Sequence, residues 1–77
     1  MGIQEFAALR VLVESDTGFK TFQTMPDQQS VWYGKSENFE DFAELVSKKV
    51  TTGSIVYLMD TSSAKIYDFD SDAWFDV

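Results

Sequence analysis

The chain contains no cysteine and no histidine, and these two absences exclude many kinds of function. Without cysteine there is neither a disulfide nor a thiolate metal site. Without histidine as well, the usual transition-metal sites, the Ser-His-Asp and Cys-His nucleophile arrangements and the commonest general base are absent. The residue types therefore predict a protein that is not an enzyme and that uses neither a metal nor another cofactor.

Basic residues are also few, with six Lys and Arg against 13 Asp and Glu, which gives a net charge of -7. This charge repels nucleic acids and anionic membrane surfaces. The start of the chain does not read as a signal peptide, and the apolar runs are too short to span a bilayer. We therefore expect a soluble protein without a nucleic-acid, membrane or small-molecule partner.

Seventy-seven residues predict one domain, residues 1–77. At this size a single hydrophobic core supplies only roughly 3 to 5 kcal/mol of net stability. Aromatic residues make up 16% of the chain, and they can add stability by burial or by contact with a partner. Self-association or docking on a larger body is therefore expected.

The amino-terminal residues 3–25 have two competing periodicities. A strand is indicated by the alternation of Leu9, Val11 and Val13. A helical face is formed by Ile3, Phe6, Ala7 and Arg10. The Asp-Thr-Gly turn at 16–18, followed by strand-forming residues at 19–24, favours a β-hairpin that Pro26 closes.

Residues 26–38 form a connection with one short extended piece around Trp32 and Tyr33, which either pack under the sheet or contact a partner. An amphipathic helix is predicted over about residues 38–50, with Asn38 as its cap. Its apolar stripe consists of Phe39, Phe42, Ala43, Val46 and Val50.

A three-stranded antiparallel meander is predicted over about residues 54–77. Its first strand is apolar on both faces, which indicates a central or covered position. Turns rich in Asp and Ser separate the strands. The predicted fold class is therefore α+β, with an amino-terminal β-hairpin, one amphipathic helix and this carboxy-terminal meander.

Asp68, Asp70 and Asp72 have the opening spacing of a calcium loop, but Ala73 stands where that loop needs glycine. The chain also ends before the bidentate Glu of such a loop. We therefore interpret Asp70 and Asp72 as turn residues.

The last third of the chain carries a residue pattern, which we call the signature. In chain order it is Gly53-Ser54, an apolar strand, Asp60-Thr61, Lys65-Ile66-Tyr67, Phe69-Asp70 and Trp74. It resembles the carboxy-terminal signature of small virion proteins of tailed bacteriophages, which are described as head-decoration, head-fibre or other structural components. Here the turn after Asp60-Thr61 is longer than is usual in those proteins.

The resemblance implies a structural role for the signature residues Gly53, Ser54, Asp60, Thr61, Tyr67, Phe69, Asp70 and Trp74. For the whole chain it implies a non-enzymatic, capsid-associated virion component of the decoration, fibre or connector type. Such a protein is made in the host cytoplasm and acts through contacts with phage structural proteins and with copies of itself.

A function of another class also fits the small size and the negative charge. A phage-encoded inhibitor can present carboxylates where phosphates lie in the nucleic-acid channel of a host protein. The acidic residues here are spread along the whole chain, without a long carboxylate run.

If the chain docks on a partner, the predicted contacts lie in its amino-terminal half. They are Phe6, Leu9, Trp32 and Tyr33. The acidic turns at Asp70 and Asp72 are costly to desolvate without a partner charge, so they are expected to face outward. The binding surface is thus predicted to lie outside the meander.

Overall fold

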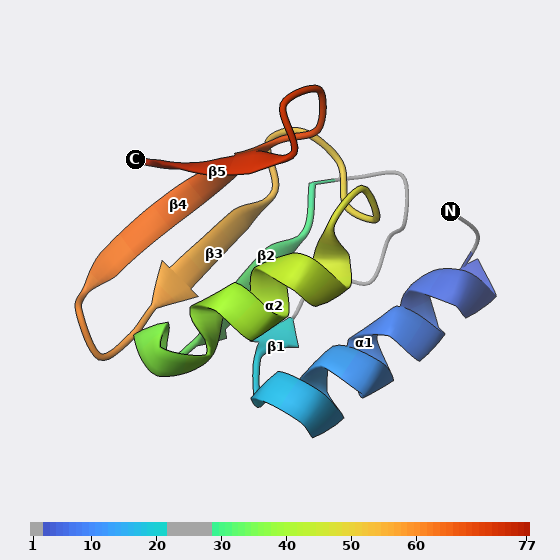
Figure 1. Cartoon of the computed structure of the whole chain (residues 1–77). Coiled ribbons are helices and arrows are strands. Elements are labelled where there is room, and N and C mark those ends of the chain that lie inside the picture. Colours follow the sequence, from blue (N-terminus) through green and yellow to red (C-terminus); the bar gives the residue numbers. More distant parts are fainter. Residues whose placement is uncertain (1–2, 22–28) are drawn as a thin grey trace.

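A computed structural model describes residues 3–21 and 29–77 of the chain (Figure 1). In chain order the elements are α1 (Ile3–Thr17), β1 (Lys20–Thr21), β2 (Val31–Gly34), the 3-10 helix η1 (Ser36–Asn38), α2 (Phe39–Val46), β3 (Ile55–Leu58), β4 (Ser63–Asp68) and β5 (Ala73–Asp76). The predicted α+β class is confirmed.

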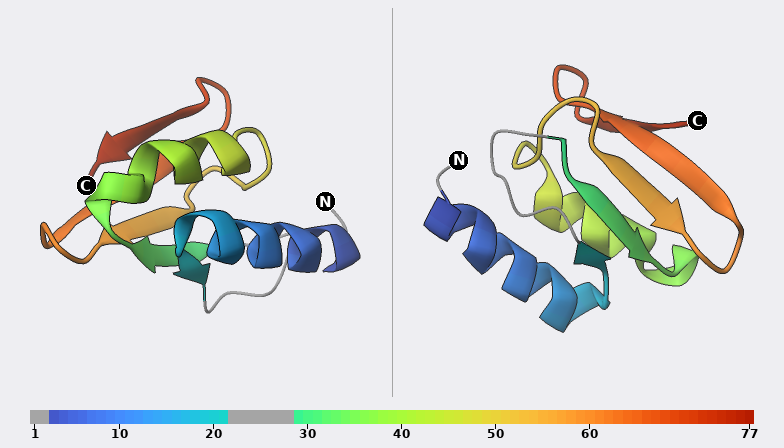
Figure 2. Two further views of the ribbon diagram at one scale, coloured as in Figure 1. Left: turned by 60° about the horizontal axis from the view of Figure 1, so that its bottom comes forward. Right: turned by 180° about the vertical axis from the view of Figure 1, so that it is seen from behind.

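The five strands form one mixed sheet in the order β1-β2-β3-β4-β5. β2 and β3 run parallel, whereas the other three neighbouring pairs are antiparallel. The connection from β2 to β3 contains η1 and α2, because parallel neighbours need a crossover that returns the chain to the same end of the sheet. In Figure 2, α2 lies along one face of the sheet and α1 lies beside α2 at the β1 edge.

Helix α1 occupies residues for which the sequence favoured a strand, so that part of the predicted hairpin is wrong. Leu9, Val13 and Thr17 are all buried, whereas Val11 is 63% exposed. Burial therefore follows the spacing of a helix rather than the alternation of a strand. The helix ends where Gly18 takes a φ of 77°, a left-handed conformation that glycine adopts without steric cost.

An amino-terminal hairpin is nevertheless present in outline. β1 pairs with β2 in antiparallel register, with Lys20 opposite Tyr33 and Thr21 opposite Trp32. The Thr21 hydroxyl donates to the Val31 carbonyl oxygen over 2.6 Å and ties the short strand to its neighbour. The turn predicted around Pro26 lies outside the described residues.

The predicted amphipathic helix is present as η1 and α2, and it is shorter than expected. Phe42 and Val46 face the core, as the apolar stripe predicts. The helix stops at Val46 because Lys48 takes a φ of 58°, which is outside the helical region. Asn38 occupies the N-cap position of α2, as predicted, but its side chain makes no capping hydrogen bond.

The carboxy-terminal meander is confirmed, and its first strand, β3, is the central strand of the sheet. Ile55 lies opposite Ile66, and Ile66 lies opposite Phe75. On the other face Tyr67 lies opposite Trp74, with 4.9 Å between the ring centroids.

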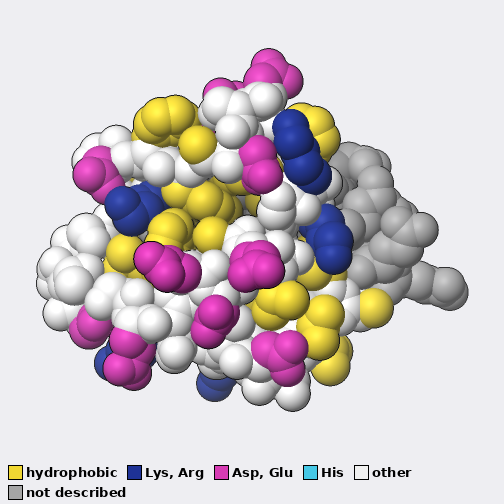
Figure 3. Space-filling model, viewed as in Figure 1, with side chains coloured by type: hydrophobic (Ala, Val, Ile, Leu, Met, Phe, Trp, Pro, Cys, Tyr) yellow, Lys and Arg dark blue, Asp and Glu magenta, His cyan; other side chains and the backbone are white. Residues whose placement is uncertain are grey.

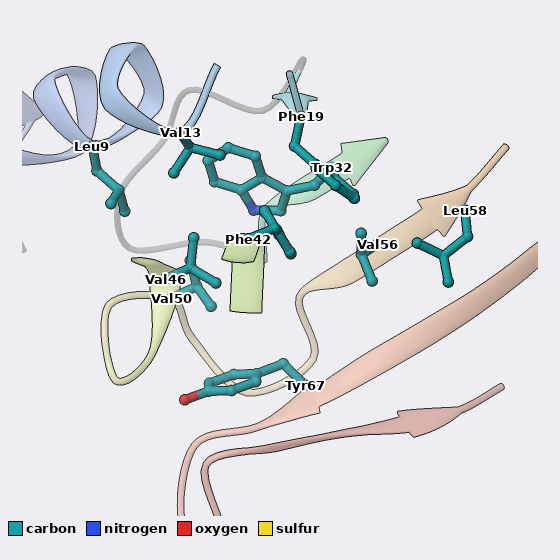
Figure 4. Packing of buried hydrophobic residues seen from close by; sticks show 10 residues of the cluster. All are labelled: Leu9, Val13, Phe19, Trp32, Phe42, Val46, Val50, Val56, Leu58 and Tyr67. Atoms are coloured by element: carbon teal, nitrogen blue, oxygen red, sulfur yellow. The ribbon is translucent and has the colours of Figure 1, made fainter. Parts of the chain in front are cut away.

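The hydrophobic core lies between the sheet and the two helices (Figure 4). Phe42 of α2 is at its centre. The Phe42 ring centroid is 4.4 Å from that of Phe19, 5.4 Å from Trp32 and 5.7 Å from Trp74. One helix residue thus joins side chains from both halves of the chain, so the helices and the sheet share a single core.

Candidate functional site

The face of the sheet turned away from α2 is apolar, and we call it the open face (Figure 2, right). Strand register places on it Val31, Tyr33, Ile55, Tyr57, Met59, Ala64, Ile66, Phe75 and Val77. The most exposed are Tyr57 (43%), Met59 (60%), Ile66 (39%), Phe75 (53%) and Val77 (81%). Contiguous apolar surface of this kind marks interaction sites in soluble proteins.

Charges are sparse on the open face. The register places only Lys20 of β1 and Asp68 of β4 there among the charged residues of the described strands. Lys65 and Asp76 point to the helix side, where Lys65 Nζ is 2.6 Å from Asp76 Oδ1. Figure 3 shows Asp and Glu side chains spread over that side. Of the two carboxylates in the described strands, Asp68 lies on the open face and Asp76 on the helix side.

At the end of the sheet near the β3–β4 turn, a depression of about 740 Å³ is lined by residues of both faces of the sheet. Its lining residues are Tyr57, Leu58, Met59, Ser62, Ser63, Ala64, Asp76 and Val77. Asp76, the only carboxylate among them, is paired with Lys65. Apolar side chains and the serines of the turn thus line the depression together.

Asp60 anchors the β3–β4 turn to the start of the helical segment. Its two carboxylate oxygens accept hydrogen bonds from the backbone N–H and the hydroxyl of Ser36, over 2.8 and 2.7 Å. These bonds lower the pKa of Asp60, because they favour the ionised carboxylate. Asp60 therefore accepts hydrogen bonds at the start of η1. Thr61 follows Asp60 in the same turn, and its hydroxyl lies 2.7 Å from that of Ser63.

Asp72 anchors the β4–β5 turn to the other end of α2. It accepts hydrogen bonds from the Ser47 hydroxyl over 2.5 Å and from the Tyr67 hydroxyl over 2.6 Å. The bonds from Ser47 and Tyr67 lower the pKa of Asp72. Burial of the Tyr67 ring, together with the bond to Asp72, raises the pKa of Tyr67. The phenol oxygen also accepts from the Lys48 backbone N–H over 3.0 Å, which completes the junction.

The aspartates with calcium-loop spacing do not converge on a common point. Asp68 accepts a hydrogen bond from the Ser71 hydroxyl over 2.7 Å, whereas Asp72 is directed to α2. Asp70 lies in the turn, as predicted. Over residues 3–21 and 29–77, no group of three or more His, Cys, Asp or Glu side chains could hold a metal ion.

Ser54 of the signature forms a buried polar junction at the start of the two parallel strands. Its Oγ accepts from the Ser30 backbone N–H over 3.1 Å and lies 3.0 Å from the Ser30 hydroxyl. The Ser30 hydroxyl accepts the indole N–H of Trp32 over 2.9 Å. Because both serines are buried, these bonds fix the β2–β3 register from within the core.

The remaining signature residues have structural positions that suit a folding unit. Gly53 takes a φ of 94° and donates its N–H to the Tyr67 carbonyl oxygen. Trp74 packs on Tyr67, whereas Phe69 lies outside the core, with Lys48 Nζ 4.4 Å from its ring centroid. Tyr67 and Trp74 therefore form a cross-strand aromatic pair, whereas Phe69 contacts a lysine side chain.

The four residues predicted to contact a partner have different positions. Leu9 and Trp32 are buried, at 5% and 0% exposure, so they are core residues and are not available to a partner in this fold. Tyr33 is half-buried and belongs to the open face. The side chain of Phe6, near the start of α1, lies outside what the structure describes.

Sequence reasoning missed most of the open face, because it placed the binding surface outside the meander. The signal was present in β3, whose side chains are apolar on both faces. A strand of that kind needs cover on both sides. Helix α2 covers one side of β3, and Tyr57 on the other side is exposed.

A scan against protein-family models, a search of curated proteins and a search of solved structures each find no match to this chain. Of the helices in residues 3–21 and 29–77, none is long and apolar enough to cross a membrane.

Proposed function

We propose that the protein is a non-enzymatic, capsid-associated virion component that works through protein–protein contacts, and that the open face is its contact surface. The observation that carries the contact function is the exposure of large apolar side chains, among them Phe75 and Met59, on one nearly uncharged face. Leaving such a face in water is unfavourable, by roughly 25 cal/mol for each Å² of apolar surface. Covering it is the simplest source of binding free energy.

The anchored turns support this function, because they hold the contact surface in one shape. Asp60 ties the β3–β4 turn to η1, which precedes α2, and Asp72 ties the β4–β5 turn to the carboxyl end of α2. A surface that is already ordered loses little conformational entropy when it binds. The protein therefore presents a prepared platform rather than a segment that folds on contact.

The assignment to a virion rests on the resemblance of the signature to small phage structural proteins. The signature residues at Ser54, Asp60 and Tyr67 form junctions between elements, and none of them belongs to the open face. A shared signature is therefore compatible with a shared fold on which the exposed residues adapt to different partners.

Mass spectrometry of purified particles tests the virion assignment. We expect the wild-type chain in many copies per particle of the phage that encodes it. Supplied in trans, an Ile66→Glu variant should be lost from particles, whereas Val11→Glu, which places the same charge on the exposed side of α1, should be retained. Absence of the wild-type chain from particles contradicts the virion assignment, and equal incorporation of the two variants contradicts the role of the open face.

A second candidate function is favoured by the helix side of the molecule. A hollow of about 410 Å³ at the end of α1 is lined by Asp16, Thr17, Asp41, Glu44 and Leu45. An acidic surface of this kind suits an inhibitor that competes with nucleic acid for a host protein. If this is the function, the immobilised chain should capture a host nucleic-acid-binding protein that single-stranded DNA displaces, and the double variant Asp41→Asn, Glu44→Gln should capture less of it.

A further inference from the structure

We propose that the open face binds a second copy of this chain, so that two sheets stack face to face in a closed two-fold dimer. This inference rests on the proposed function in so far as the open face is a contact surface, and it names the partner. Three features of the described residues support it: the distribution of charge, the size of the face and its shape.

The distribution of charge favours self-association through this face. Each chain carries a net charge of -7, so two copies repel unless the surfaces that meet exclude the acidic residues. The open face carries Lys20 near one margin of the sheet and Asp68 towards the other. A two-fold axis in the plane of contact can set the β1 side of one copy over the β4 side of the other, which brings unlike charges together.

The face is large enough for a small interface. Strands lie about 4.8 Å apart with a rise of about 3.3 Å per residue, so five strands, of which the longest has six residues and the shortest two, span at most roughly 24 by 20 Å. The accessible area of corrugated side chains exceeds this projected area. A standard interface buries about 800 Å² per partner, which is roughly a sixth of the 4691 Å² surface of this chain.

The shape of the face is self-complementary. Phe75 and Ile66 are paired across β4 and β5 and project side by side, at 53% and 39% exposure. The adjacent row contains the small side chain of Ala64, which lines the depression. In a two-fold arrangement the protruding pair of each copy can lie over the small Ala64 side chain of the other, as isologous interfaces require. Sheets that pack in this way lie about 10 Å apart with interdigitated side chains.

The competing apolar surface is the exposed side of α1, where Val11 is 63% and Leu12 43% exposed. Glu14 and Asp16 follow it in the same helix and are exposed. Two copies joined there would bring like charges close together. This surface is therefore the weaker candidate for self-association, and it supplies a matched control.

Sedimentation equilibrium over a range of concentrations tests the proposal. The wild-type chain should reach about twice its monomer mass of 8.8 kDa. Phe75→Glu should weaken dimerisation at least 100-fold, and Val11→Glu should leave it unchanged. Thermal melts followed by circular dichroism verify that each variant is folded. Val77→Glu serves as the second open-face variant, because Val77 is 81% exposed and does not belong to the core cluster.

Each outcome decides the question. The proposal is supported if Phe75→Glu and Val77→Glu are monomeric while the wild type and Val11→Glu are dimeric. If Phe75→Glu is unfolded, the result for Val77→Glu decides. A wild-type chain that stays monomeric up to millimolar concentration overturns the proposal, as does a dimer that only Val11→Glu disrupts. A monomeric chain that is still found in purified particles would overturn the dimer alone and leave the virion function in place.

Discussion

Among the described residues, α2 covers one face of the sheet and leaves the other open, although the central strand β3 is apolar on both faces. In β3, Val56 and Leu58 are at most 5% exposed, whereas Tyr57 between them is 43% exposed. The difference comes from α2, which the crossover between parallel strands places on one face only. Apolar alternation therefore predicts which residues need cover, but it does not tell whether the cover comes from the same chain or from another.

The faces also differ in how they are tied to the rest of the molecule. Side chains on the covered face take part in polar junctions, such as Tyr67 with Asp72 and Trp32 with Ser30. The central side chains of the open face, such as Tyr57 and Ile66, are apolar or amphipathic. A substitution should therefore reduce stability on the covered face and association on the open face.

The largest expected effect tests the covered face directly. Trp32→Ala removes a fully buried ring that packs on Phe42, and large-to-small changes of this kind cost about 3 to 5 kcal/mol. A domain of this size has little more than that, so the variant should be largely unfolded at 25 °C. Tyr57→Ala on the open face should lose less than about 1 kcal/mol. Urea unfolding measures both, and equal losses would contradict the contrast between the faces.

A smaller loss is expected where the covered face has no room for one more methyl group. A Cβ at Gly34 would lie 2.6 Å from the Phe19 ring, which is itself fully buried. Overpacking of this kind costs about 1 to 3 kcal/mol, so Gly34→Ala should lower the melting temperature clearly. Gly18→Ala is the control, because its methyl group meets open space and only the positive φ opposes it, at about 1 kcal/mol. A Gly34→Ala variant as stable as wild type would show that Phe19 moves aside freely.

The parts of the fold that the sequence predicted depend on local signals. The meander follows from alternating apolar residues between turns rich in Asp and Ser, and α2 follows from an apolar stripe with helical spacing. Both signals act over fewer than 25 residues and agree with the tertiary fold.

The parts that the sequence did not predict depend on contacts between distant segments. Leu9, Val11 and Val13 satisfy strand alternation, and only burial against α2 and the Trp32 ring selects the helix for α1. The parallel pairing of β2 and β3 requires a crossover that no local pattern encodes. For the candidate site, the sequence left two positions open for Trp32, packed under the sheet or in contact with a partner, because an indole suits both.

The Ser30–Ser54 junction gives the next prediction, because it joins residues 24 positions apart on the covered side of the sheet. Ser54→Ala removes the acceptor of the Ser30 N–H and leaves that buried donor unpaired, which costs about 1 to 3 kcal/mol. Ser63→Ala in the exposed β3–β4 turn should change stability by less than about 0.5 kcal/mol. Thermal melts of the two variants measure the difference. If Ser54→Ala is as stable as Ser63→Ala, the junction does not fix the parallel register.

The smallest expected effect concerns the Asp72 junction and depends on pH. The pKa of Asp72 is lowered in the fold, so its contribution to stability is complete above the ordinary value of 3.8 and is lost as the pH falls through the lowered folded-state pKa. The pKa of Tyr67 is raised, so its contribution is complete below 10.0 and is lost as the pH rises through the raised value. Asp72→Asn removes the group that titrates at low pH, so its melting temperature should vary less with pH than that of wild type at the acid extreme. The alkaline dependence should largely remain, because burial is the main cause of the raised pKa of Tyr67. Asp70→Asn, in the same turn and exposed, should follow the wild-type profile. A wild-type slope in Asp72→Asn would show that the covered face gains its acid stability elsewhere, with Asp60 at the opposite end of α2 as the first residue to test.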